Sequence, residues 1–296
     1  NVDNIVAKRG ALFMTLLKSQ VEALGYSVAH IKTDSIKIPN ADDRIKEFVI
    51  KFGKEYGYNF ETEAEFDRYC LVNDAVYVAK YKEPKIDKKT GKEIWWMSIG
   101  KQFQVPYVFK TLFSHDPIEF KDLCETFSVS SPADLYLDMN EGLQDVSALE
   151  AELKKIETKL KASPNDPILT KRAEELKAQI PAGHDYVFVG RVGQFCPIKP
   201  GLGGGVLYRG LRKNGEMKYS AAANSTGYRW LESETVMNGG SEDMIDRGFY
   251  HKLVNDAIDT ISKFGDFEWF TDCSTSQPWQ APTDPWTPET TQFDVR

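Results

Sequence analysis

The segment that most constrains the fold is AHIKTDSIKIP, residues 29–39, in which strand-favouring residues stand on both sides of a polar pair. Ile31 precedes the pair and Ile36 follows it. Thr and Asp favour tight turns because their short polar side chains bond the neighbouring backbone. We therefore expect Thr33 and Asp34 at the tip of a β-hairpin. The carboxylate there either only makes the turn or is aimed at a ligand.

Helical periodicity flanks the hairpin on both sides. Residues 5–24 repeat apolar side chains at helical spacing, and Gly25 follows where a left-handed residue commonly ends a helix. A second apolar helical face runs over residues 45–56, with Asn40 as its expected cap and Gly57 as its stop. The order helix, hairpin, helix therefore places the turn between two amphipathic helices.

Strands and a helical insertion are expected next. Residues 69–81 and 94–103 each read as one strand, separated by the charged turn KIDKKTGKE. Residues 143–181 hold two helical stretches around Ser-Pro-Asn-Asp-Pro, with seven acidic and seven basic side chains. Gly142 and Gly183 bound this segment, so we expect a helical hairpin that is appended to the core and not part of it.

The remaining residues return to strand-like patterning. Residues 241–264 predict a helix capped by Ser241, and residues 201–205, GLGGG, predict a flexible loop because no Gly-Lys-Ser/Thr follows them. The Pro-rich stretch 273–296 predicts no regular element. The aromatic and basic residues of YVFVGRVGQF could stack bases or follow a nucleic-acid backbone, but a half-buried strand shows the same pattern. We therefore expect three core side chains: Tyr186, Phe188 and Val192.

Composition excludes several classes of protein. No run of about 18 apolar residues is present to span a membrane, and the first residues do not resemble a secretory leader. The four cysteines and four histidines are dispersed, so neither a disulfide framework nor a zinc site is indicated, and a reducing cytoplasm is expected. The chain starts with Asn directly ahead of a helical pattern, and we expect it to be the C-terminal fragment of a longer protein.

The charge distribution bears on a nucleic-acid partner. A net charge of −7 argues against phosphate binding, which is driven by clustered Lys and Arg. Residues 1–110, however, carry 18 Lys and Arg against 15 Asp and Glu, and the totals of 37 and 44 leave 19 against 29 for the rest. The basic surplus therefore lies in the part of the chain that contains the hairpin.

A long helix, a hairpin with a carboxylate at its tip, a second helix and further strands together resemble the palm of family B DNA polymerases, above all the phage-type members. Motif C of that family reads Tyr-x-Asp-Thr-Asp-Ser, and HIKTDS occupies its place. The resemblance implies that Asp34 is catalytic and a metal ligand, which with an upstream aspartate would hold two Mg²⁺ ions. Thr33 and Ser35 would support the turn, and Lys32 stands where the family has its first aspartate.

A second correspondence lies in VNDAVYVAKY. Tyr77 matches the tyrosine of the family's Lys-Lys-Arg-Tyr strand, which contacts the primer, whereas Ala75 replaces a lysine of that strand. The stretches LVNDAVY, PYVFKTLFS and FCPIKPG also resemble phage-encoded members. The DNA-binding residues implied or indicated by these stretches are Tyr77, Lys80, Lys101, Arg191 and Lys199.

The resemblance implies an α+β fold in which a polymerase palm half, an antiparallel hairpin and strands with packed helices, is followed by a mixed α/β thumb. The expected division is the second half of the palm over 1–100, the start of the thumb over 101–142, a helical hairpin insertion over 143–181, an α+β thumb extension over 182–272, and an irregular tail over 273–296.

The implied activity is template-directed transfer of a deoxynucleotide to a primer 3′-hydroxyl in viral DNA replication. Primer-template DNA, deoxynucleoside triphosphates and replication accessory proteins would be the partners, in the host cytoplasm and without a membrane. The alternative is a non-catalytic nucleic-acid-binding module in which Asp34 is only a turn residue. An upstream Asp-x-x-Ser-x-Tyr-Pro stretch would distinguish the two.

Overall fold

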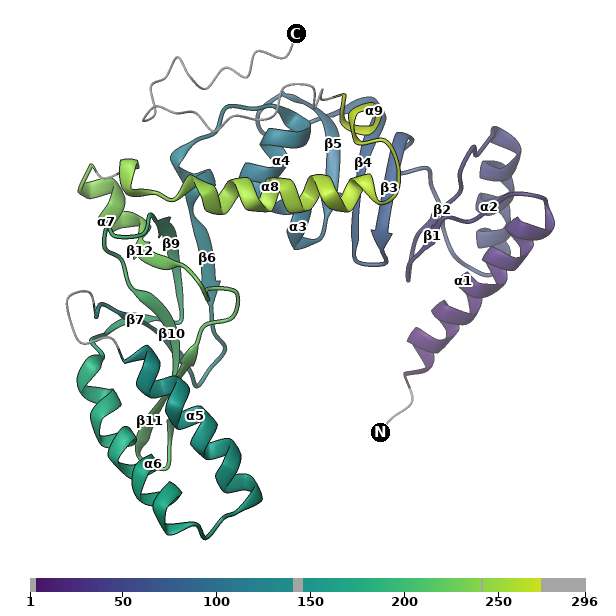
Figure 1. The fold of residues 1–296 in the computed structure, drawn as a ribbon. Helices are drawn as coiled ribbons and strands as arrows, with labels where there is room; N and C mark the ends of the chain where they lie inside the picture. Colours follow the sequence, from purple (N-terminus) through teal and green to yellow (C-terminus); the bar gives the residue numbers. More distant parts are fainter. Residues whose placement is uncertain (1–3, 141–145, 241, 273–296) are drawn as a thin grey trace. The chain divides into compact units, whose positions relative to one another are not determined.

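The chain folds into two compact units, each of which mixes helices with antiparallel sheets (Figure 1). The residues described by this computed structural model are 4–140, 146–240 and 242–272. Residues 4–117 and 253–272 form the first unit, and residues 118–252 form the second. The predicted α+β class is therefore confirmed. The predicted tail, 273–296, lies outside the described residues, and the labels palm and thumb stay predictions.

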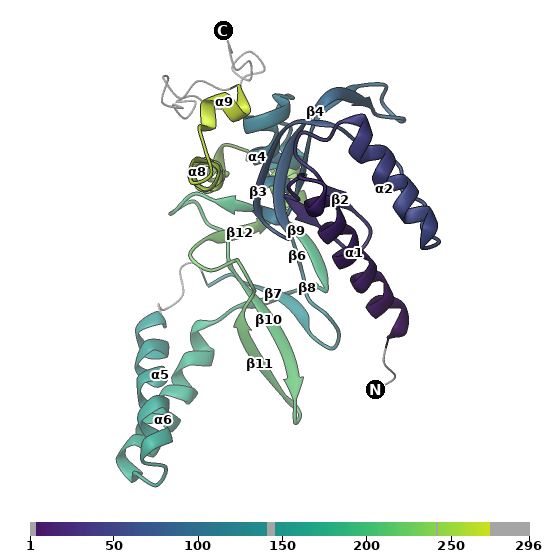
Figure 2. The same cartoon turned by 90° about the vertical axis from the view of Figure 1, so that its right-hand side faces the viewer.

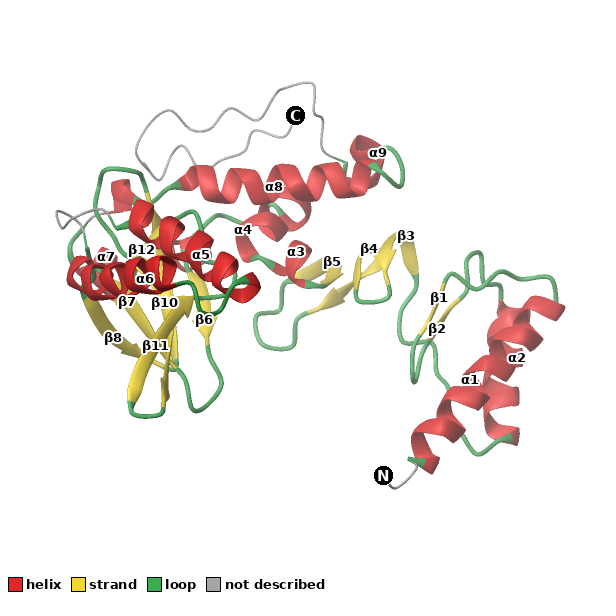
Figure 3. Ribbon diagram, turned by 60° about the horizontal axis from the view of Figure 1, so that its bottom comes forward, coloured by secondary structure: helices red, strands yellow, loops and turns green. Residues whose placement is uncertain are grey.

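The first unit begins with two helices and the predicted hairpin, as Figure 3 shows. Their bounds are α1 (Ile5–Ala23), β1 (His30–Ile31), β2 (Ile36–Lys37) and α2 (Asp43–Glu55). Ile31 and Ile36 of the hairpin pack against one apolar cluster of this part. The cluster consists of these buried side chains: Phe13, Met14, Leu17, Val21, Ile45 and Val49. Most of the apolar positions that predicted the helices are buried or half-buried, but Ile5 and Leu12 are 74% and 72% exposed.

The helix ends show one error in the sequence analysis. Gly25 and Gly57 follow α1 and α2 with φ of 88° and 81°, as expected of glycines that end helices. The cap of α2 is Asp42, whose carboxylate accepts from the backbone N–H of Ile45 at 3.0 Å. Asn40, predicted as the cap, has φ 53° in the preceding loop, a conformation that Asn tolerates better than most residues.

A three-stranded antiparallel sheet follows in the order β3-β4-β5. Its strands are β3 (Phe66–Asn73), β4 (Val76–Ile86) and β5 (Glu93–Ile99). The single strand predicted over 69–81 is wrong: the chain turns at Asp74 and Ala75, where the side chain of Asn73 accepts from the N–H of Ala75 at 2.9 Å. Strand-favouring residues stand on both sides of the turn, and the polar pair Asn73-Asp74 between them is the local signal of the turn.

Helices complete the first unit, and the longest of them begins in the second unit, ahead of residue 253. The strand predicted to reach residue 103 ends at Ile99, and the chain continues as α3 (Lys101–Gln104), α4 (Pro106–Phe109) and a π-helical turn (Lys110–Ser114). The helix predicted over 241–264 is α8 (Arg247–Ser262), which starts later than predicted because a 3-10 turn (Glu242–Met244) precedes it. The predicted cap Ser241 lies outside the described residues. A short helix, α9 (Phe267–Thr271), follows.

The second unit contains two sheets, with strand orders β11-β10-β7-β8 and β12-β9-β6. Figure 2 shows β10 and β11 as an extended two-stranded arm. The strands are β6 (Glu125–Ser128), β7 (Asp134–Asp138), β8 (Tyr186–Gly190), β9 (Val192–Ile198), β10 (Val206–Lys213), β11 (Glu216–Ala221) and β12 (Arg229–Glu232). The helices are α5 (Ser147–Ala162), α6 (Pro167–Gln179) and α7 (Ser233–Asn238), with 3-10 turns at Phe120–Leu123 and Ile180–Gly183.

The core of the second unit is aromatic, but it does not include the side chains predicted for β8 and β9. Trp230 and Phe195 are fully buried, and Phe127 packs edge-on against both. Phe188 and Val192 are each 62% exposed, so their predicted core placement is wrong. Tyr186 is half-buried.

The helical hairpin of α5 and α6 has an apolar core of its own, which confirms its expected helices. Ile156, Ala173 and Leu176 are buried there against leucines of the same two helices. The sheet residues on either side of the hairpin lie next to each other, since the N–H of Met139 donates to the carbonyl of Asp185 at 2.8 Å. The hairpin therefore extends from one point of the sheet.

Deleting the hairpin tests whether it is an appended element. Replacing residues 143–181 by a short Gly/Ser linker should remove far-UV helical signal and leave the thermal midpoint of the rest within a few degrees, because the linker joins neighbouring points at small entropic cost. The hairpin contains no tryptophan, so tryptophan emission reports on the remainder. As a control, Leu176→Ala should melt the hairpin helices without altering that emission. Collapse of the midpoint on deletion would contradict an appended hairpin.

Candidate functional site

The predicted hairpin tip is a four-residue turn from Lys32 to Ser35. The N–H of Lys32 donates to the carbonyl of Ser35 at 2.8 Å, and Ile31 pairs with Ile36 directly behind the turn. Thr33 and Asp34 occupy the two central positions, and both are exposed. The prediction that Asp34 lies at the tip of a tight turn is therefore confirmed.

The base of the hairpin stands on aromatic side chains of β3 and β4. His30 is buried, and its Nδ1 lies 3.2 Å from the hydroxyl of Tyr69. Tyr69 stacks on Tyr77 with ring centroids 5.2 Å apart, and Tyr77 meets the ring of His30 edge-on at 5.5 Å. The Nζ of Lys32 lies 5.0 Å from the centre of the Tyr77 ring, a cation–π distance. These contacts fix the direction in which the tip projects.

Burial and two lysines set the protonation states of the side chains at the foot of the hairpin. The pKa of His30 is lowered, first by burial and then by the charges of Lys32 and Lys37, so His30 is neutral at pH 7. Burial also raises the pKa of Tyr69, which therefore keeps its proton and can donate it to Nδ1 of neutral His30. Burial lowers the pKa of Lys37 as well, and this lysine donates to the hydroxyl of Ser35 at 3.2 Å.

Asp34 can supply one ligand to a metal ion, but the surrounding residues do not complete a site. Across residues 4–140, 146–240 and 242–272, no three His, Cys, Asp or Glu side chains are grouped closely enough to hold a metal. Asp42 is engaged by the hydroxyl of Tyr26 at 2.8 Å, and Asp43 lies 3.7 Å from Lys46. The described residues by themselves therefore do not fit a two-Mg²⁺ site.

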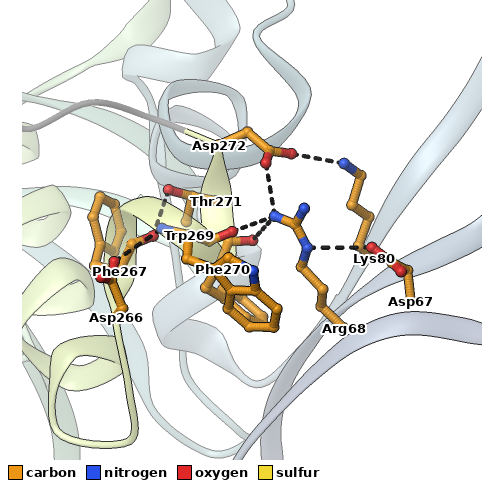
Figure 4. Close-up of polar contacts among 9 residues, drawn as sticks. All are labelled: Asp67, Arg68, Lys80, Asp266, Phe267, Trp269, Phe270, Thr271 and Asp272. Carbon is orange, nitrogen blue, oxygen red and sulfur yellow. Dashed lines mark hydrogen bonds and ion pairs between the residues drawn. The ribbon is translucent and has the colours of Figure 1, made fainter.

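Lys80, a predicted phosphate contact, is paired with the C-terminal part of its own unit (Figure 4). Its Nζ lies 2.7 Å from Asp272, which is also bound by Arg68 at 2.8 Å. Arg68 donates to the carbonyl groups of Trp269 and Phe270 at the end of α9 as well. Burial raises the pKa of Asp272, but Lys80 and Arg68 together outweigh it and lower the net value. These contacts hold α9 against β3 and β4.

The other predicted DNA contacts have separate environments. Tyr77 is buried under Lys32, where it supports the hairpin. Lys101 begins α3 and is exposed. The side chain of Arg191 is 62% exposed, with Nε 3.9 Å from Asp134, and Lys199 donates to the carbonyl of Asp243 at 2.7 Å. The structure thus brings Tyr77 and Lys32 to the hairpin and gives Lys80 and Lys199 partners within the protein.

Sequence reasoning missed His30 and Tyr69 as supports of the tip. The available signal was a histidine two positions before the turn, which strand alternation places on the side of β1 opposite Ile31. The tyrosine that meets it is 39 residues further along the chain. No local pattern joins the two.

Comparison with protein-family models, curated proteins and solved structures gave no match to this chain. Within the described residues, none of the helices combines the length and the apolar character needed to cross a bilayer.

The lowered pKa of His30 predicts a pH-dependent contribution to stability. Below about pH 6.5 the unfolded chain protonates His30 before the folded protein does, so stability is present above that pH and is lost as pH falls towards the folded pKa. The free energy of unfolding of His30→Gln, measured by denaturant titration from pH 8 to pH 5, should therefore fall less than that of the wild type. His115 and His251 also have lowered pKa values and remain in both proteins, so the difference isolates His30. A difference that does not vary with pH would contradict this assignment.

Proposed function

We propose that this chain supplies the second half of a DNA polymerase palm, in which Asp34 is one carboxylate of the centre that transfers a deoxynucleotide to a primer 3′-hydroxyl. The observation that carries the proposal is an exposed carboxylate at the centre of a tight turn whose base is held on buried His30 and on Tyr77. A turn residue with no further role would not need such support. The sequence HIKTDS, in the place of motif C, adds the family B resemblance.

The residues of the hairpin have distinct tasks in this proposal. Asp34 presents negative charge at the tip, and Lys32 places a positive charge on the Tyr77 ring behind it. Two bound Mg²⁺ ions would activate the primer hydroxyl and stabilise the leaving pyrophosphate. Asp34 would hold them together with an upstream carboxylate. Neutral His30 keeps a third positive charge away from Lys32 and Lys37, which already repel each other.

Primer-template DNA and deoxynucleoside triphosphates are the proposed partners, with replication accessory proteins, in the cytoplasm of a host cell. In the first unit, Lys101 is exposed and Lys32 is half-exposed, so both can reach phosphate groups. A phosphate that recruits Lys80 must compete with Asp272 at 2.7 Å.

A non-catalytic nucleic-acid-binding module is the second candidate. One observation favours it: among the residues that the structure describes, no group of three His, Cys, Asp or Glu side chains that could hold a metal includes Asp34. Sequencing the full gene separates the two functions, because a polymerase requires an upstream Asp-x-x-Ser-x-Tyr-Pro stretch and a lysine-rich fingers helix.

Neutralising Asp34 in the intact enzyme tests its catalytic role. Asp34→Asn should lower primer extension by at least about 100-fold, because losing a metal ligand raises the barrier by several kcal/mol, while primer-template affinity persists. Asp43→Asn is the matched control, since it removes an equal charge from an exposed side chain nearby and should retain extension. Lys32→Ala should mainly change DNA affinity and its salt dependence. Wild-type extension by Asp34→Asn would refute the proposal.

The 296-residue chain on its own should bind primer-template DNA weakly and incorporate no nucleotide at any Mg²⁺ or Mn²⁺ concentration. One carboxylate leaves most of a hydrated Mg²⁺ shell unreplaced and binds the ion poorly. Radiolabelled primer extension with the purified chain measures this, and adding the upstream palm and fingers should restore synthesis. Incorporation by the chain alone that depends on Asp34 would show that a second ligand lies within it.

A further inference from the structure

The four-stranded sheet of the second unit carries aromatic side chains on one side. Residues paired across antiparallel strands project to the same side of a sheet. The strand registers put five rings together on one side: Tyr136, Tyr186, Phe188, Tyr208 and Tyr219. Tyr136 lies 5.6 Å from Phe188 and 5.2 Å from Tyr219, and Tyr186 stacks on Tyr219 at 3.7 Å, measured between ring centroids. We call this set the aromatic face.

The aromatic face is not the core side of its sheet. The opposite side carries Leu135, Leu137 and Leu207, which are at most 5% exposed. On the aromatic face no ring is fully buried, and Phe188 is 62% exposed. The sheet therefore covers one side with its own core and leaves rings accessible on the other.

Gly210 lets one of these rings approach the backbone of β10 closely. A Cβ atom at this position would lie 2.5 Å from Cε2 of Tyr136, closer than real Cβ contacts allow. The absence of a side chain brings the ring against the backbone of β10, between Phe188 and Tyr219. Phe188 and Tyr219 stand edge-on to the Tyr136 ring, at interplanar angles of 72° and 90°.

Two arginines accompany the aromatic face of this acidic protein, whereas Arg209, Lys213 and Lys218 project to the opposite side of the sheet. Residues 186–221 contain six Lys and Arg and one Glu, against a net charge of −7 for the whole chain. Arg212 is exposed and pairs with Met217 on the same side as Tyr219, and the side chain of Arg191 is 62% exposed beside β8.

Two acids lie on the same side of the sheet. Asp134 pairs with Gly210 across the strands and is 3.9 Å from the Nε of Arg191, so a phosphate that recruits Arg191 must compete with it. Asp138 is buried, 2.5 Å from Nδ1 of His184, and accepts from the N–H of Asp185.

We propose that the aromatic face binds single-stranded nucleic acid, with unpaired bases stacked on Phe188, Tyr136 and Tyr219 and phosphate groups contacted by Arg212 and Arg191. Aromatic rings beside a basic track are the combination that binds single strands without sequence preference. Only unpaired bases offer a free surface to such rings, so duplex DNA should bind more weakly. The site goes beyond the proposed catalytic centre, because it lies in the other unit and does not require Asp34.

Fluorescence anisotropy of a labelled oligothymidylate of about 20 nucleotides, titrated with the 296-residue chain, tests the stacking contact. Phe188→Ala should weaken binding by about tenfold, the scale of one lost base–ring stack. Val187→Ala is the matched control, since Val187 is 47% exposed on the same strand, projects to the opposite side and should leave affinity unchanged. Because both side chains are exposed, the thermal midpoints should stay close to wild type.

A second pair of variants tests the phosphate contact. Arg212→Gln should lower the slope of log affinity against log salt concentration by about 0.7, the value for one single-strand phosphate contact. Lys213→Gln, the exposed neighbour on the opposite side, should leave the slope unchanged. Ultraviolet crosslinking with 5-iododeoxyuridine in the oligonucleotide should modify the peptide that contains Phe188.

Three results would overturn the proposal: no binding of the oligonucleotide by the wild-type chain, equal losses from Phe188→Ala and Val187→Ala, or tighter binding of a duplex of the same length. Asp34→Asn must leave oligonucleotide binding unchanged and abolish only primer extension by the intact enzyme. Failure of the single-strand site is therefore visible separately from failure of the polymerase assignment.

Discussion

The burial of one apolar cluster between α1 and α2 determines what the hairpin can do. Leu17, Val21 and Ile45 are fully buried, and each contributes about 1.5–3 kcal/mol relative to exposure. The isoleucines of the hairpin pack on the same cluster, so both strands of the turn are anchored although each is two residues long. An isolated hairpin of this size would not persist in water. The position of Asp34 is therefore a product of helix packing as much as of turn chemistry.

Features that one segment encodes by itself were predictable from the sequence. The two helices, their glycine stops, the turn at Asp34 and the α5–α6 hairpin all follow from local periodicity and turn residues. The α2 cap was misplaced because both Asn40 and Asp42 are good capping residues, and only the backbone geometry decides between them. The turn at Asp74 was missed because strand-favouring residues stand on both sides of it, although the polar pair Asn73-Asp74 signals a turn.

Features that depend on distant partners could not be predicted. In YVFVGRVGQF apolar side chains occupy both sides of the strand, so alternation cannot say which side is the core. The neighbouring leucines of β7 and β10 decide it, and they leave Phe188 outside. Likewise the partner of Lys80 is 192 residues away, on a helix end that the local sequence around Lys80 does not indicate.

Because Tyr136 lies against Gly210, the residues tolerated at these two positions, on different strands, depend on each other. A side chain at 210 would displace the ring, so the glycine is required only while an aromatic residue of this size occupies position 136. Exchange at 210 becomes tolerable only after position 136 has become smaller, which fixes the order in which the two substitutions can accumulate. Among homologous chains, positions 136 and 210 should therefore covary. A large aromatic residue at 136 should occur with glycine at 210, and a small residue at 136 should allow a small side chain at 210.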